Sequence, residues 1–260
     1  METGNALRII SYNVNGIRSA INKGFMEWLA GYPADIICMQ ETKAFQDNID
    51  HAAISDLGYH QYWYSAQKKG YSGVAVFSRV KPDNVGYGNG YMQSDSEGRV
   101  LRLDIGDLTL INAYFPSGTT GEIRQTYKYQ WLDEFFEYLQ LLKKERPQLI
   151  VCGDYNICHK PIDIHDPVSN KKSSGFLPEE RAWMDKFFSS GFTDTFRHFN
   201  PHPHQYSWWS FRANARANNK GWRIDYINAT ENLNTRLSDA CILPDVRHSD
   251  HCPVCLSLLP

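Results

Sequence analysis

The sequence predicts an α/β or α+β fold in which β-sheets pack against each other beneath a small number of helices. Short apolar runs rich in β-branched residues alternate with loops along the whole chain. Far fewer stretches carry apolar residues at helical spacing. Many strands with few helices favour packed sheets over a helical bundle. No internal repeat or Gly/Ser-rich linker interrupts the 260 residues, so we expect one domain covering residues 1–260.

The predicted strands are short, apolar and bounded by turn residues. They span residues 8–12, 36–40, 74–78, 100–105, 109–114, 149–152, 224–228 and 253–259. Runs such as IICMQ and LIVC are apolar at almost every position, which is typical of strands buried in a sheet. These strands therefore form the expected core.

The clearest predicted helix runs from about Gln125 to Glu145 and ends before Pro147. Its apolar residues recur every three or four positions: Tyr127, Trp131, Phe135, Tyr138, Leu139 and Leu142. A second helix is expected from Pro178, where Glu179 and Glu180 complement the helix dipole. Shorter helices are expected over residues 25–30 and 49–57.

Charge and composition exclude several classes of protein. The chain is 42% apolar, far more than a disordered chain. Lys and Arg total 27 against 29 Asp and Glu, a net charge of −2, which disfavours a protein that coats nucleic acid through bulk positive charge. No apolar run is long enough to span a membrane, and the N-terminus METGNALRIIS lacks a secretion signal. We expect an intracellular protein, in the cytoplasm or nucleoid.

The six cysteines fit a reduced compartment. Cys38 and Cys152 lie in predicted strands, where free thiols act as small apolar groups. Cys252 and Cys255 form a single CxxC pair, and no second pair completes a zinc site. We therefore disfavour structural zinc or a redox pair.

Polar side chains gather at the ends of the predicted strands. They are Asn13, Asn15, Glu41, Tyr114, Asp154, Asn156, Asp225, Asp250 and His251. Taken singly, each has an ordinary explanation, such as a solvated strand end, a turn or a structural histidine. Taken together, they are how a sheet scaffold presents a functional site.

This set contains several oxygen donors and one imidazole but no thiolate pattern. Oxygen ligands suit Mg²⁺ or Mn²⁺ better than zinc, and such cations serve phosphate chemistry. The sequence contains neither GxxxxGK[ST] nor GxSxG, which disfavours a P-loop NTPase and an α/β-hydrolase. Hydrolysis of a phosphate ester is the chemistry that these residues favour.

A specific resemblance covers almost the whole chain. The segments SYNVNGIRS, QETK, GYSGVAVFSR, EGR, YFPSG, GDYN, NKKSSGF, NARANNKGWRIDY and SDHCP occur in this order. The sequence closely resembles the exonuclease III family of apurinic/apyrimidinic (AP) endonucleases, within the endonuclease/exonuclease/phosphatase superfamily. GDxN and SDH are shared across that superfamily, whereas QETK, NKKSSGF and GWRIDY point to its DNA-repair branch.

The resemblance implies a DNase I-like, four-layered α/β sandwich with two packed mixed sheets flanked by helices. It also implies that Glu41 is the main ligand of Mg²⁺, for which Mn²⁺ substitutes. The further residues that it places at the metal are Asn13, Asn15, Asp154, Asn156, Asp250 and His251.

Catalytic roles follow from the same resemblance. Asp154 activates or aligns the attacking water, and Asn156 orients it. Tyr114 contacts the phosphate or the leaving oxygen. His251, oriented by Asp225, binds the phosphate. Which carboxylate acts as base stays open, because coupled groups share protons.

DNA contacts are expected along residues 170–224, which carry nine basic and four acidic residues interleaved with aromatic residues. A solvated surface explains this pattern as well as a groove for the DNA backbone does. The resemblance assigns Trp208, Trp222 and Ile224 to a pocket for a flipped-out, base-less sugar. Lys43, Asn170 and Lys171 are further polar residues near the site. Thr120 and Arg212 stand where some relatives insert an Arg and a Met into the duplex.

We therefore expect a monomeric DNA repair nuclease that cleaves duplex DNA on the 5′ side of an abasic site. Activity as a 3′-phosphodiesterase, 3′-phosphatase or 3′→5′ exonuclease is compatible with the same site. The alternatives are an enzyme that is mainly an exonuclease or that cuts at deoxyuridine or other lesions. A catalytically dead DNA-binding protein is a different class, which the intact set of polar residues disfavours.

Overall fold

Residues 6–260, which the computed structural model describes, build two six-stranded sheets. Sheet A contains, in spatial order, β11 (Leu237–Ile242), β12 (Val254–Leu258), β1 (Leu7–Asn13), β2 (Ile36–Gln40), β4 (Val74–Ser78) and β3 (His60–Tyr64). Sheet B contains β5 (Asn84–Tyr87), β6 (Val100–Ile105), β7 (Leu108–Tyr114), β8 (Gln148–Asp154), β10 (Asp225–Thr230) and β9 (Phe192–Asp194). In each sheet one pair is parallel, β1 with β2 and β7 with β8, and the other pairs are antiparallel. Both sheets are therefore mixed, as expected.

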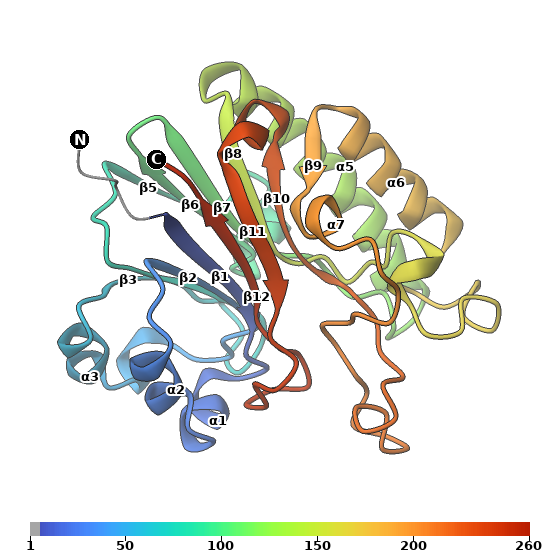
Figure 1. Cartoon of the computed structure of the whole chain (residues 1–260), viewed down its shortest axis with the longest axis horizontal. Helices are drawn as coiled ribbons and strands as arrows, with labels where there is room; N and C mark the ends of the chain where they lie inside the picture. Colours follow the sequence, from blue (N-terminus) through green and yellow to red (C-terminus); the bar gives the residue numbers. More distant parts are fainter. Residues whose placement is uncertain (1–5) are drawn as a thin grey trace.

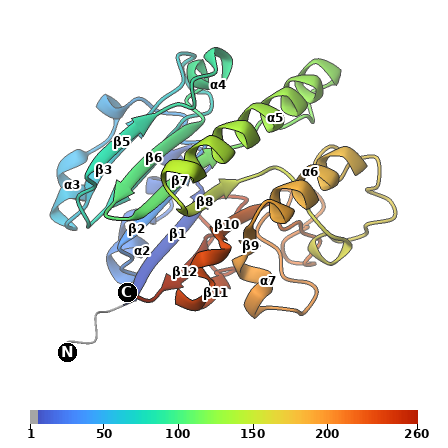
Figure 2. The same ribbon diagram turned by 90° about the horizontal axis from the view of Figure 1, so that it is seen from above.

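Helices cover the outer face of each sheet (Figures 1 and 2). Sheet A is covered by α1 (Ile17–Asn22), α2 (Phe25–Gly31) and α3 (His51–Asp56). Sheet B is covered by α5 (Glu122–Glu145) and α6 (Pro178–Ser189). The shorter elements are α4 (Met92–Ser96), α7 (Thr195–Phe199) and the 3₁₀ turns η1 (Gln46–Asn48), η2 (Pro161–Asp163) and η3 (Glu231–Arg236). The four-layered α/β sandwich is confirmed.

Side-chain alternation explains why the central strands are apolar throughout. Ile9 of β1 packs between the two sheets, whereas its neighbour Ile10 packs against the helices of sheet A. Likewise Ile150 of β8 faces sheet A, and Val151 faces α5 and α6. Because successive strand residues point to opposite faces, a strand between two packed layers is apolar at consecutive positions.

The eight strands predicted from the sequence are the eight interior strands of the two sheets. The four edge strands β3, β5, β9 and β11 were not predicted. Their residues are more exposed and more polar, as in NVGY of β5 and LSDACI of β11. An edge strand has one unpaired side and carries a weaker apolar pattern.

Two element boundaries differ from expectation at the polar residues of interest. The strand expected to end at Cys152 continues to Asp154. The last strand begins at Val254, so His251 lies in the preceding loop, where it forms an isolated bridge with Trp208. The side chains of Asp154 and His251 therefore lie at the same end of the two sheets.

A buried ion-pair network ties η2 to sheet B. Asp163 accepts hydrogen bonds from Arg223 Nε at 2.7 Å and from Arg197 Nη2 at 2.7 Å, and Arg223 Nη2 donates to Asp194 at 2.6 Å. Asp163 and Arg223 are each 1% exposed. Although burial opposes its ionisation, the two guanidinium groups hold the pKa of Asp163 below its usual value.

We expect Asp163→Asn to lower the free energy of unfolding by about 3–5 kcal/mol, because Arg197 and Arg223 then lose the buried carboxylate that they share and Arg223 keeps only Asp194 as an acidic partner. The native pKa of Asp163 is depressed, so its contribution is present above its ordinary unfolded value of about 4 and is lost as pH falls further. Thermal unfolding of both proteins should therefore differ most at neutral pH, and the difference should shrink as pH falls below about 4 and through the depressed native pKa of Asp163. Equal melting temperatures at pH 7 would contradict this assignment.

No helix in the described part of the chain is long and apolar enough to cross a membrane. The first five residues, which belong to the N-terminal stretch expected to lack a secretion signal, lie outside the described residues.

Candidate active site

One cavity of about 800 Å³ opens where strands of both sheets end. Most of the polar residues singled out from the sequence line it, although they come from segments far apart in the chain. Its lining includes Asn15, Glu41, Lys43, Tyr114, Asp154, Asn156, Trp208, Trp222, Ile224, Asp250 and His251. Asn13 and Asp225 lie directly behind this lining and bond to it.

Strand register places three of these residues side by side in sheet B. Tyr114 of β7 is the register partner of Asp154 in β8, and Asp154 is the partner of Asp225 in β10. Gly153 allows β7 and β8 to approach closely just before Asp154. Its φ is +148°, and a Cβ there would lie 1.8 Å from the carbonyl oxygen of Ala113. A side chain at residue 153 would therefore displace Asp154.

Left-handed backbone conformations mark the turns that carry the site. Asn15, Glu41, Lys43 and Asn156 all have φ between 44° and 56°. Such conformations cost energy for residues other than glycine and cluster at functional sites. Each turn directs its polar side chain into the cavity.

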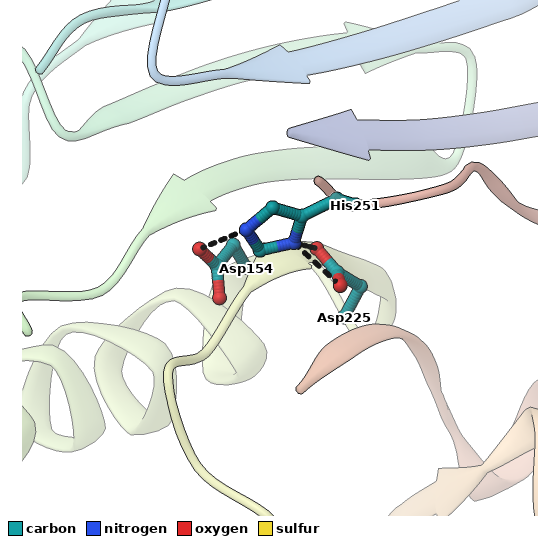
Figure 3. A group of neighbouring side chains, drawn as sticks. All are labelled: Asp154, Asp225 and His251. Carbon is teal, nitrogen blue, oxygen red and sulfur yellow. Dashed lines mark hydrogen bonds and ion pairs between the residues drawn. The ribbon is translucent and has the colours of Figure 1, made fainter. Parts of the chain in front are cut away.

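His251 lies between two aspartates (Figure 3). Its Nδ1 is 2.9 Å from Asp225 Oδ2, and its Nε2 is 3.9 Å from Asp154 Oδ2. Asp225 is itself fixed by Ser207, whose hydroxyl donates to Oδ2 at 2.6 Å. Burial alone would lower the pKa of His251, but the Asp225 and Asp154 carboxylates outweigh it and raise that pKa to about 10. The imidazole is therefore a buried cation at neutral pH.

Asp154 is held by amide groups of Asn13 and Asn156. Asn13 Nδ2 donates to its Oδ2 at 2.8 Å, and the Asn156 backbone N–H donates to its Oδ1 at 2.9 Å. Burial, with Asp225 nearby, raises the pKa of Asp154 to about 7, against the opposing effect of His251. A carboxyl group with a pKa near neutrality is suited to accept a proton.

On the other side of the cavity, side-chain oxygen atoms of Glu41 and Asn15 bind the ammonium group of Lys43. Lys43 Nζ lies 2.8 Å from Glu41 Oε1 and 2.6 Å from Asn15 Oδ1. Asn15 Nδ2 donates to Asp250 Oδ1 at 2.8 Å, which brings a second carboxylate to this group. Because the lysine stem is flexible and the side chain is 34% exposed, its ammonium can leave. The donor set fits a hard divalent cation.

Asp250 stays ionised beside this group. Although burial opposes ionisation, His251, Asn15 and Trp208 hold its pKa below the usual value. Trp208 Nε1 donates to Asp250 Oδ2 at 3.0 Å. The indole therefore connects the oxygen cluster with the apolar part of the cavity.

Asn13 links the two carboxylates. Its Nδ2 donates to Glu41 Oε2 at 3.1 Å as well as to Asp154, and its Oδ1 accepts from the Asn15 backbone N–H at 2.9 Å. The amide group of Asn13 thus bridges Glu41 and Asp154, and its oxygen, which can accept two hydrogen bonds, accepts one from the backbone.

A second group that could hold a metal is Asp154, Asp225 and His251, whose ligand atoms lie within 4.8 Å of one another. A dication there would have to displace the proton on His251 and compete with its ion pairs. On the Glu41 side a dication would have to displace the Lys43 ammonium, whose side chain is partly exposed and flexible.

Tyr114 lies near the carboxylates of Glu41 and Asp154, and its ring packs on the buried Arg99 side chain. The Arg99 guanidinium lies 4.9 Å from the ring centroid and donates to the Tyr114 carbonyl oxygen at 2.8 Å. Burial, followed by Glu41 and Asp154, raises the pKa of Tyr114 well above its usual value. The phenol therefore stays protonated and can donate a hydrogen bond.

An apolar recess adjoins the carboxylates. Trp208 and Trp222 meet edge to face with ring centroids 6.0 Å apart, and Ile224 lies beside them. The recess is backed by the buried residues Cys158, Ile164 and Phe176. It provides a dry wall within the same cavity.

Three residues expected to bind DNA, Asn170, Lys171 and Arg212, do not line the cavity. Lys171 and Arg212 are exposed, and Asn170 Nδ2 closes its own loop by donating to Asp166 O at 2.9 Å. The basic stretch over residues 170–224 is also not uniform. Arg223 and Arg197 are bound in the ion-pair network with Asp163, so they are not available to phosphates.

Several cavity residues were missed. Ser117, Thr119, Ser173 and Ser174 line the cavity, and Ser207 fixes Asp225. The first four lie in or beside the YFPSG and NKKSSGF segments of the family resemblance, which could have identified them. Ser207 has no such signal, because only the fold brings it to Asp225.

Comparisons with known proteins agree with this geometry. The Endonuclease/Exonuclease/phosphatase family model matches residues 10–251. The chain is 43% identical over 250 residues to an exodeoxyribonuclease from Bacillus subtilis, covering 95% of this chain and 98% of that protein. It is 38% identical over 255 residues to the DNA repair nuclease APEX1 of Danio rerio, covering 97% and 82% of the two chains.

The solved structure of an AP endonuclease from Archaeoglobus fulgidus superimposes with a TM-score of 0.89 at 32% identity, covering 97% of this chain and 99% of that one. These similarities support a hydrolytic nuclease of DNA repair. The fold, the cavity and the extent of the matches together show that this chain belongs to the Endonuclease/Exonuclease/phosphatase family.

Proposed function

We propose that this protein is a monomeric, Mg²⁺-dependent AP endonuclease that cleaves the phosphodiester on the 5′ side of an abasic site in duplex DNA. The products are a 3′-hydroxyl and a 5′-deoxyribose phosphate. The observation that carries this proposal is the apolar recess of Trp208, Trp222 and Ile224 beside the carboxylates and His251. A sugar without a base fits a small dry recess, and an unpaired nucleotide costs less to extrude.

In this mechanism Asp154 accepts a proton from the attacking water, and Asn156 orients that water. The pKa of Asp154 near 7 matches this role. His251, charged at neutral pH, contacts the phosphate, and Asp225 fixes its orientation. Tyr114 donates a hydrogen bond near the leaving oxygen.

Mg²⁺ is assigned to the oxygen cluster of Glu41, Asn15 and Asp250, where the Lys43 ammonium already finds a cation site. A bound Mg²⁺ supplies neutralisation of charge on the phosphoryl oxygens and on the leaving oxygen.

A 5′-labelled duplex with one tetrahydrofuran abasic analogue tests the proposed reaction. We expect a single labelled product that ends in a 3′-hydroxyl one nucleotide before the lesion, which a DNA polymerase extends directly. A product cut on the 3′ side of the lesion, or no cleavage, would sink the proposal.

An enzyme that is mainly a 3′→5′ exonuclease is the second candidate, favoured by the similarity to an exodeoxyribonuclease over nearly the full chain. Both reactions break a phosphodiester at the same carboxylates. They differ in whether the recess receives an abasic sugar within a strand or the nucleotide at a 3′ end.

The recess itself can be tested by substitution. Trp222→Ala should lower kcat/KM on the abasic duplex by about 10- to 200-fold, because missing apolar contacts in a pocket are worth about 1–3 kcal/mol. Trp222→Phe, which keeps an aromatic wall, should recover most of that loss. Steady-state kinetics on abasic and recessed 3′ substrates gives the readout. An equal loss on both substrates would argue against selection by the recess.

A further inference from the structure

A fully buried ion pair lies outside the cavity, between the two helices that cover sheet B. Lys128 of α5 and Glu180 of α6 have Nζ and Oε1 2.5 Å apart, and both side chains are 0% exposed. Burying two charges costs several kcal/mol per ion, so such a pair stabilises a fold no better than apolar residues of similar size. The other hydrogen bonds of Lys128 and Glu180 therefore indicate the role of this ion pair.

The ammonium group of Lys128 holds the turn that follows Asp154. Its Nζ donates to the carbonyl oxygen of Asn156 at 2.8 Å. The same residue has a φ of 52° and donates its backbone N–H to Asp154. Lys128 thus fixes, from beneath, the turn that carries two of the proposed catalytic residues.

The carboxylate of Glu180 holds a second segment, residues 173–177. Its Oε2 accepts from the backbone N–H of Gly175 at 2.6 Å and of Leu177 at 2.9 Å. Residues Ser173, Ser174 and Gly175 line the cavity. From the sequence, most of this segment was expected only as part of NKKSSGF in the family resemblance, and Glu180 only as a residue that complements the dipole of the helix beginning at Pro178.

The two held segments also pack on each other and on the recess. Gly175 has a φ of +94°, and a Cβ there would lie 3.0 Å from Asn156 O and 3.1 Å from Trp222. Its carbonyl oxygen accepts from the Cys158 backbone N–H at 2.7 Å. A shift of residues 173–177 would therefore move the wall of the recess.

Gln125 extends the network to a third cavity segment. Its Nε2 donates to Glu180 Oε1 at 3.1 Å, and its Oε1 accepts from Ser174 Oγ at 2.6 Å. That Oε1 also lies where a Cβ on Gly118 would be, 1.9 Å away. Glu180 consequently accepts four hydrogen bonds, which is about the capacity of one carboxylate.

We propose that Lys128, Glu180 and Gln125 are positioning residues that hold the Asn156 turn and residues 173–177 in the arrangement that DNA requires. This inference rests on the proposed function for its activity readout. None of the three side chains is among the residues that line the cavity. They set the shape of the cavity through the backbone groups that they bind.

Glu180→Gln is the informative single variant. Glutamine keeps the shape of glutamate, but its single oxygen accepts at most two hydrogen bonds. Its NH₂ group would face hydrogen-bond donors that Glu180 now accepts from. We expect kcat/KM on the abasic duplex to fall about 10- to 100-fold, as for other groups that orient a site. KM should rise because residues 173–177 loosen, and kcat should fall because the Asn156 turn shifts.

A double variant separates positioning from stability. Lys128→Met with Glu180→Gln removes both buried charges, so no unpaired ion destabilises the fold. Its melting temperature should stay within a few degrees of the parent, while amide hydrogen exchange rises within residues 154–158 and 173–177 and not in β1. Gln125→Leu changes a half-buried position and should raise KM with little effect on kcat. This variant tests the inference if the double variant does not fold.

The matched control is Asp133→Asn. Asp133 forms an exposed ion pair with Lys186 at 3.9 Å between the same two helices, and its side chain is 73% exposed. It should leave kcat, KM and hydrogen exchange unchanged. Wild-type kinetics and exchange in the Glu180→Gln and Gln125→Leu proteins would overturn the inference. Failure of the parent enzyme to cut abasic DNA would instead count against the proposed function, because the exchange readout needs no substrate.

Discussion

Asp154→Asn is expected to lower the rate of cleavage at an abasic site by about 10²–10⁴-fold, the usual contribution of a positioned proton acceptor. The amide keeps the shape of the carboxylate but cannot take a proton from water. Duplex binding should persist, because removing a negative charge from the cavity reduces repulsion of the phosphates. Single-turnover rates and a gel-shift assay on the same duplex measure both effects.

The control for this variant is Asp185→Asn, the same change at a carboxylate that is 56% exposed and pairs with Lys160. It should cleave at the parent rate. Cleavage by the Asp154→Asn protein within a few fold of the parent would rule out Asp154 as the proton acceptor.

Removing divalent cations is expected to abolish cleavage. EDTA should stop the reaction, and Mg²⁺ or Mn²⁺ should restore it, because the oxygen cluster around Glu41 is then held by Lys43 alone. Glu41→Gln should raise the Mg²⁺ concentration needed for half-maximal rate and lower kcat by about 10²–10³-fold, since a bound cation supplies several kcal/mol to the transition state. A Mg²⁺ titration of both proteins gives these values.

Glu137→Gln provides the matched control, because Glu137 is an exposed carboxylate of α5 that bonds to Tyr91. Its Mg²⁺ dependence should equal that of the parent. Undiminished cleavage in EDTA would contradict a metal-dependent mechanism.

The interior strands of both sheets could be predicted from the sequence and the four edge strands could not, for a physical reason. Strands such as β2 and β4 are buried on both faces and therefore read as continuous apolar runs. The edge strands β3 and β11 carry exposed and polar positions, so their pattern does not separate them from loops. Hydrogen bonding to the neighbouring strand, more than the local sequence pattern, makes these segments strands.

Cavity residues were predicted where a polar residue follows an apolar run, as at Glu41 and Asp154; Asp225, predicted in the same way, lies directly behind the lining. The residues that support the cavity could not be found this way. Ser207 and Lys128 act through contacts with residues distant in sequence, Asp225 and Glu180. Arg223 is one of the nine basic residues counted over residues 170–224, and the structure buries it against Asp163 and Asp194. Only the tertiary structure distinguishes these cases.

The net charge of −2 is compatible with this distribution. Carboxylates concentrate in the cavity, and several basic residues of the stretch over residues 170–224 pair with acidic partners. If the proposed function holds, we expect the exposed residues Lys171, Lys172, Arg212 and Lys220 to supply the contacts of this stretch with the DNA backbone.

The most direct test of the proposed function compares three duplexes under identical conditions with Mg²⁺. One carries a tetrahydrofuran abasic analogue, one a deoxyuridine, and one a recessed 3′ end. If the recess selects a base-less sugar, the abasic duplex is cleaved fastest by at least about 10-fold, in line with the discrimination that an apolar pocket provides. Faster removal of 3′-terminal nucleotides, or faster cleavage at deoxyuridine, would contradict the assignment of this enzyme as an AP endonuclease.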